Sequence, residues 1–560
     1  MKKGTLNSWI QASRPAEPGF LRFIRDNAVP IALSALIGMV ADFAFSNWFL
    51  SVGVPPGLSL FLSFFPSSIL SSSWWVLKWI ENKEKVRLDF FIFIYLMALF
   101  LRGGIYDIFI RIGWPVQASI IAVVIATVIH SYIGIAFIHL IRNNPELRWK
   151  AISLAVAGYM FVLRLYYIGS VELLPQEAYY WLYARHLDIG YLDHPPMVAW
   201  IIWANSLVFG NSEFSIRFGA FLLWMAAAFF CFGLTRNLSG KTAGFVAICL
   251  FSVLPFFFAI GFVMTPDAPL TACWAGALYF LERALIGKKR LAWWGAGICV
   301  GLGMLSKYTI ALLLPSALLF MLIDRESRGW LLRPEPFAAV LVSIFLFLPV
   351  IIWNAQHDWV SFIFQGPMRL RGELSFNLPQ LLGSVILLLT PIGAAAVFSG
   401  FRKLRVKLIE EKQDVFSLVF LLCPFLVFFL FSFVRDVKLN WTGPLWIMAL
   451  PIMAGQMISV YEASQRGMDL FLKRAWALTV IVCIFFWGAS LHFLALGAPG
   501  IKSLASLHIT GTNSARKMRK MRGSSIRQAA IFSGWTASCS SIGPSITSMR
   551  LKRRGSPLSL

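Results

Sequence analysis

The chain has 560 residues, of which 58% are hydrophobic and only 14% are charged. An ordinary soluble domain carries about 25% charged residues, so this composition excludes a soluble globular protein. In a soluble protein the net charge of +24 would suggest a nucleic-acid partner. Membrane proteins, however, concentrate Lys and Arg in cytoplasmic loops, and no basic stripe falls on a soluble domain here. We therefore expect no nucleic-acid partner.

The chain starts with a polar and basic segment, Met1 to Asp26, so the first apolar run is expected to act as its own insertion signal. Four apolar runs follow, each long enough to cross about 30 Å of hydrocarbon. They lie at roughly 28–50, 53–77, 89–107 and 116–141. Residues 1–145 are therefore predicted to form a four-span front unit.

Residues 150–497 are predicted to form a second, larger membrane unit. Its apolar runs lie at roughly 151–171, 215–235, 242–263, 268–286, 291–306, 308–323, 336–353, 377–399, 414–434, 441–459 and 475–497. With the front unit, the length rule predicts an all-α polytopic membrane protein of about 15 spans. Residues 498–560 are rich in Ser, Arg and Lys, and we expect a basic, disordered tail there.

The distribution of Lys and Arg tests this layout. With the N-terminus in the cytoplasm, and leaving the C-terminal tail aside, about 28 of them fall in inner loops and about 7 in outer loops. The apolar segment 196–210 is short, at about 15 residues, which fits a helix lying along the membrane better than a crossing. Counting it as a crossing would move the later basic loops to the outside, so we place it on the outer surface.

In this topology, polar residues that could carry chemistry gather on the outer face. The first outer loop of the larger unit contributes Glu177, Tyr179, Tyr180, Asp193 and His194, and later loops contribute Asp267, Lys307, His357, Arg435 and Lys438. Ionisable groups near the hydrocarbon boundary are costly, and they usually mark a functional path.

These residue types match what glycosyl transfer from a sugar phosphate requires. A carboxylate near the acceptor hydroxyl can act as general base or hold a metal, and Glu177, Asp193 and Asp267 are candidates. A cation must hold the phosphate and stabilise the leaving group, which Lys307 or Arg435 could do. Aromatic rings at 179–181 could pack against the sugar or the lipid.

Each residue also has a plain structural interpretation. Glu177 could simply face water, and the aromatic run could be an interfacial belt. Asp267, which follows Pro266, could cap a helix, and Lys307 could extend its amine to the interface. The indication of function comes from the whole set lying on one side of the membrane.

Cofactors are not clearly indicated. The seven Cys show no C-x-x-C spacing, so we predict neither a disulfide framework nor a cysteine metal site. A divalent metal is possible, and Asp193 with His194 would be its ligand pair. The alternative is that His194, which precedes Pro195 and Pro196, only shapes the loop.

Several motifs resemble bacterial glycosyltransferase family 39, which is related to the dolichyl-phosphate-mannose protein mannosyltransferases and to the aminoarabinose transferase of lipid A. The motifs are Gln176-Glu177-Ala-Tyr-Tyr-Trp, Asp193-His194-Pro-Pro-Met, Thr265-Pro-Asp267-Ala-Pro-Leu, Ser306-Lys307-Tyr308, Trp353-Asn-Ala-Gln-His357-Asp-Trp and Lys438-Leu-Asn-Trp-Thr-Gly-Pro. They occur in the family's order, and the resemblance covers about residues 150–460.

The resemblance implies a GT-C fold, in which the first outer loop carries the catalytic carboxylate on short helices along the membrane. It implies an inverting transfer from a polyprenyl-phosphate sugar to lipid A, lipopolysaccharide, another glycan or a protein, on the periplasmic side of a bacterial inner membrane. Glu177 and Asp267 match the catalytic acidic positions. Many relatives have an acidic residue where this chain has Gln176, so the role of base would pass to Glu177 or Asp267.

The front unit weakly resembles the four-span GtrA-like proteins that are thought to help move polyprenyl-linked sugars across membranes. The resemblance rests on its span count, on Arg22 and Arg25, and on Arg102-Gly103-Gly104. The alternative is that these spans only scaffold the enzyme.

Two other classes of function remain open at this point. A transporter or flippase would move polyprenyl-linked sugars without covalent chemistry, but 150–497 has no clear internal repeat, and its polar groups lie at one face. A structural or assembly protein would give no reason for Glu177, Asp267 and Lys307 to converge.

Overall fold

The computed structural model describes residues 28–81, 88–143, 148–370, 374–407, 411–462 and 467–496. These residues form α-helices, short 3-10 helices and loops, with no strand among them. The described helices all belong to one compact unit that ends at Leu496. Arg22, Arg25 and the predicted tail 498–560 lie outside the described residues.

The front unit consists of four long helices, two of which end where the sequence places glycine and proline. The helices are α3 (Ala28–Ser51), α4 (Pro56–Glu81), α5 (Leu88–Arg111) and α6 (Val116–Asn143). After α3 and after α5, a glycine adopts a left-handed conformation, with φ of 83° at Gly53 and 90° at Gly113. A proline follows two residues later in each case, so the helix cannot continue, and the chain turns back.

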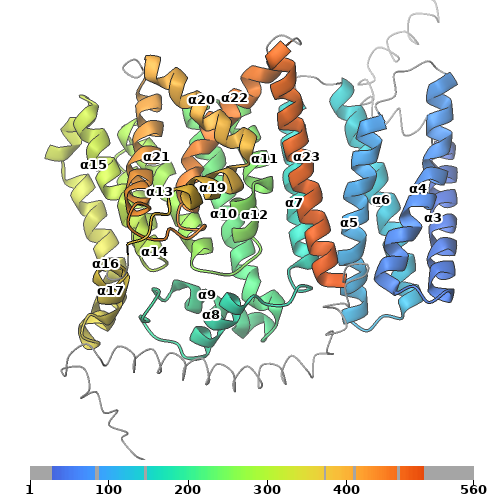
Figure 1. Ribbon diagram of the computed structural model, residues 1–560, viewed down its shortest axis with the longest axis horizontal. Helices are drawn as coiled ribbons and strands as arrows, with labels where there is room; N and C mark the ends of the chain where they lie inside the picture. The colour runs from blue at the N-terminus through green and yellow to red at the C-terminus, as the bar shows by residue number, and fades with distance from the viewer. Residues whose placement is uncertain are drawn as a thin grey trace, which may run out of the picture. The chain divides into compact units, whose positions relative to one another are not determined.

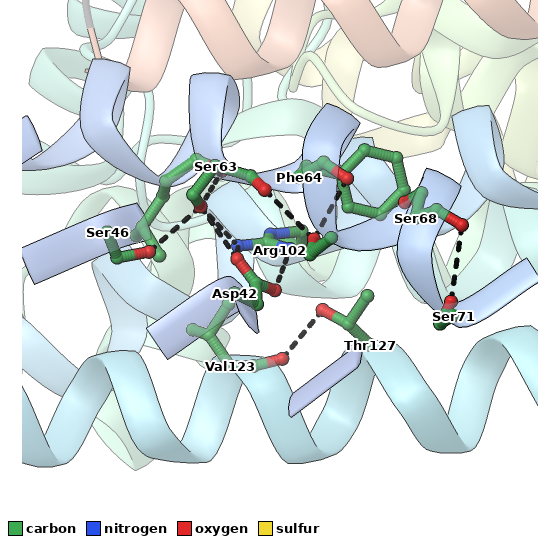
Figure 2. A network of polar contacts seen from close by, with 11 residues as sticks. Asp42, Ser46, Ser63, Phe64, Ser68, Ser71, Arg102, Val123 and Thr127 are labelled. Atoms are coloured by element: carbon green, nitrogen blue, oxygen red, sulfur yellow. Dashed lines mark hydrogen bonds and ion pairs between the residues drawn. The ribbon is translucent and has the colours of Figure 1, made fainter. Parts of the chain in front are cut away.

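A buried polar network links three helices of the front unit (Figure 2). Arg102 of α5 forms a two-pronged ion pair with Asp42 of α3, with N–O distances of 2.5 and 2.9 Å. Ser63 of α4 donates a hydrogen bond of 2.7 Å to the same carboxylate, and Ser46 donates to Ser63. Because a buried charge is tolerated only when it is paired, this network fixes how α3, α4 and α5 pack.

The larger unit contains the remaining elements. They are α7 (Arg148–Tyr167), α8 (Pro175–Arg185), α9 (Met197–Phe209), α10 (Glu213–Ser239), α11 (Lys241–Val253), α12 (Pro255–Ile260), α13 (Asp267–Leu285), α14 (Ala292–Met304), η2 (Tyr308–Leu312), α15 (Leu313–Ile323), η3 (Ser327–Leu332), α16 (Pro334–Gln356), α17 (Val360–Gln365), α18 (Pro367–Leu370), α19 (Leu378–Leu389), α20 (Pro391–Lys407), α21 (Lys412–Phe431), η4 (Gly443–Met448), α22 (Ala449–Glu462) and α23 (Gly467–Leu496). The main apolar core includes Phe251, Trp274, Phe320 and Phe416, all less than 3% exposed. It joins α11, α13, α15 and α21.

Two predicted spans are broken rather than straight. The run 242–263 divides into α11 and α12 at Pro255, which has no N–H for a helical hydrogen bond. The run 377–399 divides into α19 and α20, which bend by 101°. Thr390, between them, has a φ of 68° and precedes Pro391, and both features end a helix.

Each predicted span range contains a helix, but the predicted count of about 15 spans is not confirmed. Among the described residues, six helices are long and apolar enough to cross a membrane, or seven if the bent pair is one span. The helices within 291–306 and 308–323 are shorter than the length that this test requires. The fold is therefore that of a helical, multi-pass membrane protein.

The two short helices expected in the first outer loop of the larger unit are present as α8 and α9. They lie together below the ends of the long helices (Figure 1), at what we call the site end. With 13 residues, α9 has a length of about 20 Å, which is too short to cross about 30 Å of hydrocarbon.

Candidate functional site

Glu177 lies in the first turn of α8, and its side chain is fully buried. Arg217 of α10, which is also buried, donates to both carboxylate oxygens, at 2.8 and 2.7 Å. The backbone N–H groups of Leu174 and Met264 donate to the same carboxylate, both at 3.0 Å. Four donors therefore surround Glu177, and no part of its side chain faces solvent.

This environment does not suit the catalytic role that we predicted for Glu177. A general base must reach the acceptor hydroxyl, whereas this carboxylate is enclosed and its oxygens are already hydrogen-bonded. The guanidinium of Arg217 also donates to the carbonyls of Val171 and Glu172, at 2.6 and 2.8 Å. Glu177 and Arg217 together hold the segment between α7 and α8 onto α10 and onto the segment before α13.

Replacing Glu177 with alanine should therefore reduce stability before it affects chemistry. Arg217 would be left buried without a counter-charge, and breaking a buried pair in this way costs about 3–5 kcal/mol. We expect a lower thermal unfolding midpoint in detergent. The double variant Glu177→Ala/Arg217→Leu should recover part of the loss, because it removes the unpaired charge. A midpoint unchanged in Glu177→Ala would contradict this structural role.

Asp193 forms a second cluster with α8. Tyr183 donates a hydrogen bond to one of its carboxylate oxygens, and Nδ1 of His194 lies 3.1 Å from the other. The hydroxyl groups of Tyr179 and Tyr183 are 2.5 Å apart, and Gln365 of α17 donates to the backbone carbonyl of Asp193. The carboxylate is 23% exposed, so it can be reached by a ligand.

The surroundings of Asp193 favour its charged form. Burial alone would raise its pKa, but the imidazole of His194 at 3.1 Å and the hydroxyl groups of Tyr183 and Tyr179 lower the pKa below the usual 3.8. Burial and the nearby Asp193 charge raise the pKa of Tyr179 to about 12, and they raise that of Tyr183 further. Near neutral pH the cluster therefore holds an ionised carboxylate beside neutral phenols.

Removing one of these donors should change the pH dependence of activity in a defined direction. A hydrogen bond to the charged form lowers a carboxylate pKa, so Tyr183→Phe should raise the pKa of Asp193. The acid limb of kcat/KM should then move to higher pH in Tyr183→Phe, because Asp193 is protonated earlier as pH falls. A profile with the same midpoint in wild type and variant would argue against Asp193 as the titrating group.

Asp267 forms a third cluster at the start of α13. One carboxylate oxygen accepts a hydrogen bond from Nζ of Lys307 at 2.9 Å, and the other accepts from Nδ2 of Asn440 at 2.5 Å. The side chains of Asp267 and Lys307 are only 7% and 14% exposed. Lys307 and Asn440, which follow Asp267 by 40 and 173 positions in the chain, are thus held on one carboxylate. Nζ of Lys307 has three donors, so it can also bind a ligand.

Tyr180 connects the Asp193 and Asp267 clusters. Its ring lies 5.6 Å from that of His194, and it packs with Met264 and Ala268 on either side of Asp267. Burial is the main cause that raises the pKa of Tyr180, and the charges of Asp193 and Asp267 raise it further. Both carboxylates therefore act on this phenol. The structure therefore brings Glu177, Asp193, Asp267 and Lys307 to the site end.

The remaining predicted residues lie toward the edge of this region. His357 stacks on Trp353, with ring centroids 4.1 Å apart, and Trp353 donates to Asp188 of the outer loop. Lys438 is exposed and Arg435 half-buried, in the segment that also supplies Asn440. No contact between the side chains of His357 or Lys438 and Asp193 or Asp267 is seen among the described residues, so these two are weaker members of the site.

The sequence analysis did not single out four residues that build these clusters, namely Tyr183, Arg217, Gln365 and Asn440. Arg217 had a signal, because a charged residue inside the predicted span 215–235 is costly and needs a partner. Tyr183 lies four residues after Tyr179, on the same face of a helix. Asn440 lies in the motif Lys438-Leu-Asn-Trp-Thr-Gly-Pro, although its own role was not predicted. Gln365 had no signal, since only the fold brings it to the site.

A metal site finds little support in the part of the chain that the structure describes. Within those residues there is no group of three or more His, Cys, Asp or Glu side chains that could hold a metal ion. Asp193 and His194 remain a pair, and they already contact each other.

The fold and these clusters define a class: helical membrane proteins with a lysine and several carboxylates at one end of the bundle. Residues 193–353 match the model of the dolichyl-phosphate-mannose-protein mannosyltransferase family. The resemblance drawn from the sequence is thus confirmed for this segment, which includes Asp193, Asp267 and Lys307. The front unit lies outside the match, so its GtrA-like nature stays a prediction.

Several curated relatives are bacterial glycosyltransferases. The lipid A galacturonosyltransferase RgtD of Rhizobium johnstonii is 28% identical over 37% of this chain and 44% of its own length. The undecaprenyl phosphate-alpha-4-amino-4-deoxy-L-arabinose arabinosyl transferase 2 of Proteus mirabilis is 26% identical, over 53% of this chain and 57% of its own length. The chain spans about half the length of the curated relatives it matches.

Solved structures show more distant similarity. ArnT from Cupriavidus metallidurans, bound to undecaprenyl phosphate, aligns with a TM-score of 0.47 and 16% identity, covering 63% of this chain and 76% of ArnT. An oligosaccharyltransferase from Archaeoglobus fulgidus aligns with a TM-score of 0.43 and 13% identity, covering 62% of this chain and 57% of that protein.

Proposed function

We propose that this protein transfers a sugar from a polyprenyl-phosphate donor to a glycolipid of the lipid A or lipopolysaccharide class. The main support is that Asp193, Asp267 and Lys307 all come from the segment that matches the mannosyltransferase family. The relatives named above act on lipid A or transfer a sugar from undecaprenyl phosphate. Glycans or proteins remain alternative acceptors.

In this proposal Asp193 is the general base. Its carboxylate is ionised, partly exposed and oriented by Tyr183 and His194. It accepts the proton of the acceptor hydroxyl, whose oxygen attacks the anomeric carbon of the donor sugar. The bond between that carbon and the phosphate oxygen breaks, and polyprenyl phosphate leaves with the bonding electrons. Attack opposite the leaving group inverts the anomeric configuration.

Lys307 binds the phosphate in this proposal. Asp267 and Asn440 hold the lysine in place, while its remaining N–H donors can contact phosphate oxygens. A fixed cation beside the leaving phosphate stabilises the charge that develops there as the bond breaks. Asp267, predicted as catalytic, thus acts by positioning Lys307.

We also propose the membrane orientation predicted from the basic loops. The N-terminus lies in the cytoplasm and the site end faces the periplasm of a bacterial inner membrane. The excess of Lys and Arg that the sequence places in the predicted inner loops supports this orientation. The site end would then meet a lipid-linked donor in the outer leaflet.

Turnover by the purified protein tests the function. The full chain in nanodiscs is mixed with lipid A and with undecaprenyl phosphate carrying radiolabelled 4-amino-4-deoxy-L-arabinose, or in a second arm galacturonic acid. We expect label on lipid A and release of undecaprenyl phosphate in at least one arm. Movement of intact donor across a proteoliposome membrane, without cleavage, would instead support a flippase. Absence of cleavage in both arms would overturn the proposal for this donor and acceptor class.

A further inference from the structure

The front unit makes a direct contact with the loop that carries the candidate site. Arg111, the last residue of α5, donates from a terminal nitrogen to the carbonyl of Ser170, at 2.9 Å. Its Nε donates to Asp107, one turn earlier on α5, at 2.6 Å. Asp107 is only 7% exposed, so it holds the guanidinium in one orientation. The pair thus presents a fixed donor to the loop.

The position of α5 is itself fixed by close packing against the larger unit. A Cβ atom at Gly103 would lie 2.3 Å from the His492 ring of α23 and 2.6 Å from the Tyr167 hydroxyl of α7. Only glycine allows this approach. The Tyr167 hydroxyl also donates to the carbonyl of Phe100, at 2.6 Å. Arg111 lies about two helical turns beyond this contact, so its place relative to the loop is well determined.

The loop segment 168–172 is held from two sides. Arg111 of the front unit binds the carbonyl of Ser170, and Arg217 of α10 binds the carbonyls of Val171 and Glu172. The segment leads within a few residues into α8, which carries Tyr179 and Tyr183. These tyrosines in turn contact each other and Asp193.

We propose that the front unit positions the candidate site, with Arg111 and Asp107 acting as a clamp on the turn that precedes α8. Arg111 is a positioning residue: it acts on Asp193 through the turn, α8 and Tyr183. Without the clamp, the turn would keep the contacts of Arg217 and the hydrogen bonds of Ser170 to the end of α7, but it would lose its tie to α5, and the start of α8 would fluctuate more. The Tyr183–Asp193 hydrogen bond would then form for less of the time. The effect on catalysis rests on the proposed function, whereas the effect on the loop does not.

Hydrogen exchange tests the clamp without any assay of transfer. In Arg111→Leu, amides in 168–186 should exchange faster than in wild type, while those of α10 and α13 should be unchanged. Arg111→Lys keeps a donor for Ser170 and should restore much of the protection. Arg290→Leu is the control, because the Arg290 side chain is 69% exposed and lies 3.4 Å from Glu335, far from 168–186 in the chain. Unchanged exchange of 168–186 in Arg111→Leu would overturn the inference, whatever the activity of the protein.

The pH profile of transfer distinguishes positioning from a general loss of folded protein. Arg111→Leu should lower kcat by about 10- to 100-fold, as expected when a reacting group is misplaced. Its acid limb should also move to higher pH, as in Tyr183→Phe, because the Tyr183 hydrogen bond to Asp193 is weakened. A smaller population of folded protein would lower the rate at every pH without shifting the acid limb. A lower rate with an unshifted acid limb would overturn the role in catalysis. If Arg111→Leu does not fold, Asp107→Asn provides the same comparison with smaller expected effects.

Discussion

Replacing Asp193 with asparagine should lower kcat for sugar transfer by about 10²–10⁴-fold, the range in which a positioned general base contributes. The amide cannot accept the proton of the acceptor hydroxyl. It keeps the size of the carboxylate and can still accept the hydrogen bond from Tyr183. KM for the donor should therefore change little. Steady-state rates with radiolabelled donor, measured on protein of equal purity and monodispersity, provide the comparison.

Asp358→Asn is the matched control for this prediction. Asp358 is an exposed carboxylate in the turn between α16 and α17, and its φ of 52° is one that asparagine also adopts readily. This variant should keep wild-type kcat. If Asp193→Asn were also fully active, Asp193 could not be the base, and another group would have to accept the proton.

Replacing Asp267 with asparagine should lower kcat/KM by about 10²–10³-fold, the loss seen when one group that stabilises developing charge is removed. Lys307 and Asn440 both donate to this carboxylate. An amide at position 267 must turn its own NH₂ group toward one of these donors, so that contact is lost. Lys307 would no longer be held against the phosphate, and donor binding should weaken as well as kcat.

A double-mutant cycle shows whether Asp267 acts through Lys307. If the two residues work as a unit, Lys307→Met and Asp267→Asn/Lys307→Met should be about equally impaired, because the second change removes nothing further. Fully additive losses would mean that Asp267 has a separate role. Asp436→Asn is the control, since Asp436 is exposed and lies in the same segment as Asn440.

Glu177, which the sequence analysis predicted as catalytic, is buried and paired with Arg217 in the structure. The sequence analysis assigned it to chemistry because it is an acidic residue at the start of the first outer loop. In the structure it anchors that loop, and the partly exposed carboxylate available to a ligand belongs to Asp193. Gln176, in place of an acidic residue, therefore need not mean an inactive protein, because the proposed base comes from another motif of the same loop.

The front unit has a comparable place in the structure. The sequence suggested either a GtrA-like unit or a scaffold, and the comparisons leave that choice untested. The contact between Arg111 and Ser170 supports the scaffold interpretation, because it joins the front unit to the turn before α8. The buried Asp42–Arg102 pair joins α3 to α5. It thereby helps to fix the position of Arg111, at the end of α5, relative to Ser170.

The sequence by itself determined the helical membrane class and the position of most helices, because long apolar runs and the Gly and Pro residues that end them are local features. It also indicated that Asp193, Asp267 and Lys307 belong to one region, since their motifs follow the order of a known family. The sequence did not predict the helix breaks at Pro255 and Pro391. Each run is apolar on both sides of its proline, so the hydrophobic pattern is not interrupted there.

Only the tertiary structure decided what each polar residue does. Glu177 is enclosed by Arg217, which lies 40 positions further along the chain, whereas the carboxylate of Asp193 stays accessible. Gln365 and Asn440 reach the site in the same way. Burial and pairing are properties of the packed molecule, and they set which acids are available for chemistry.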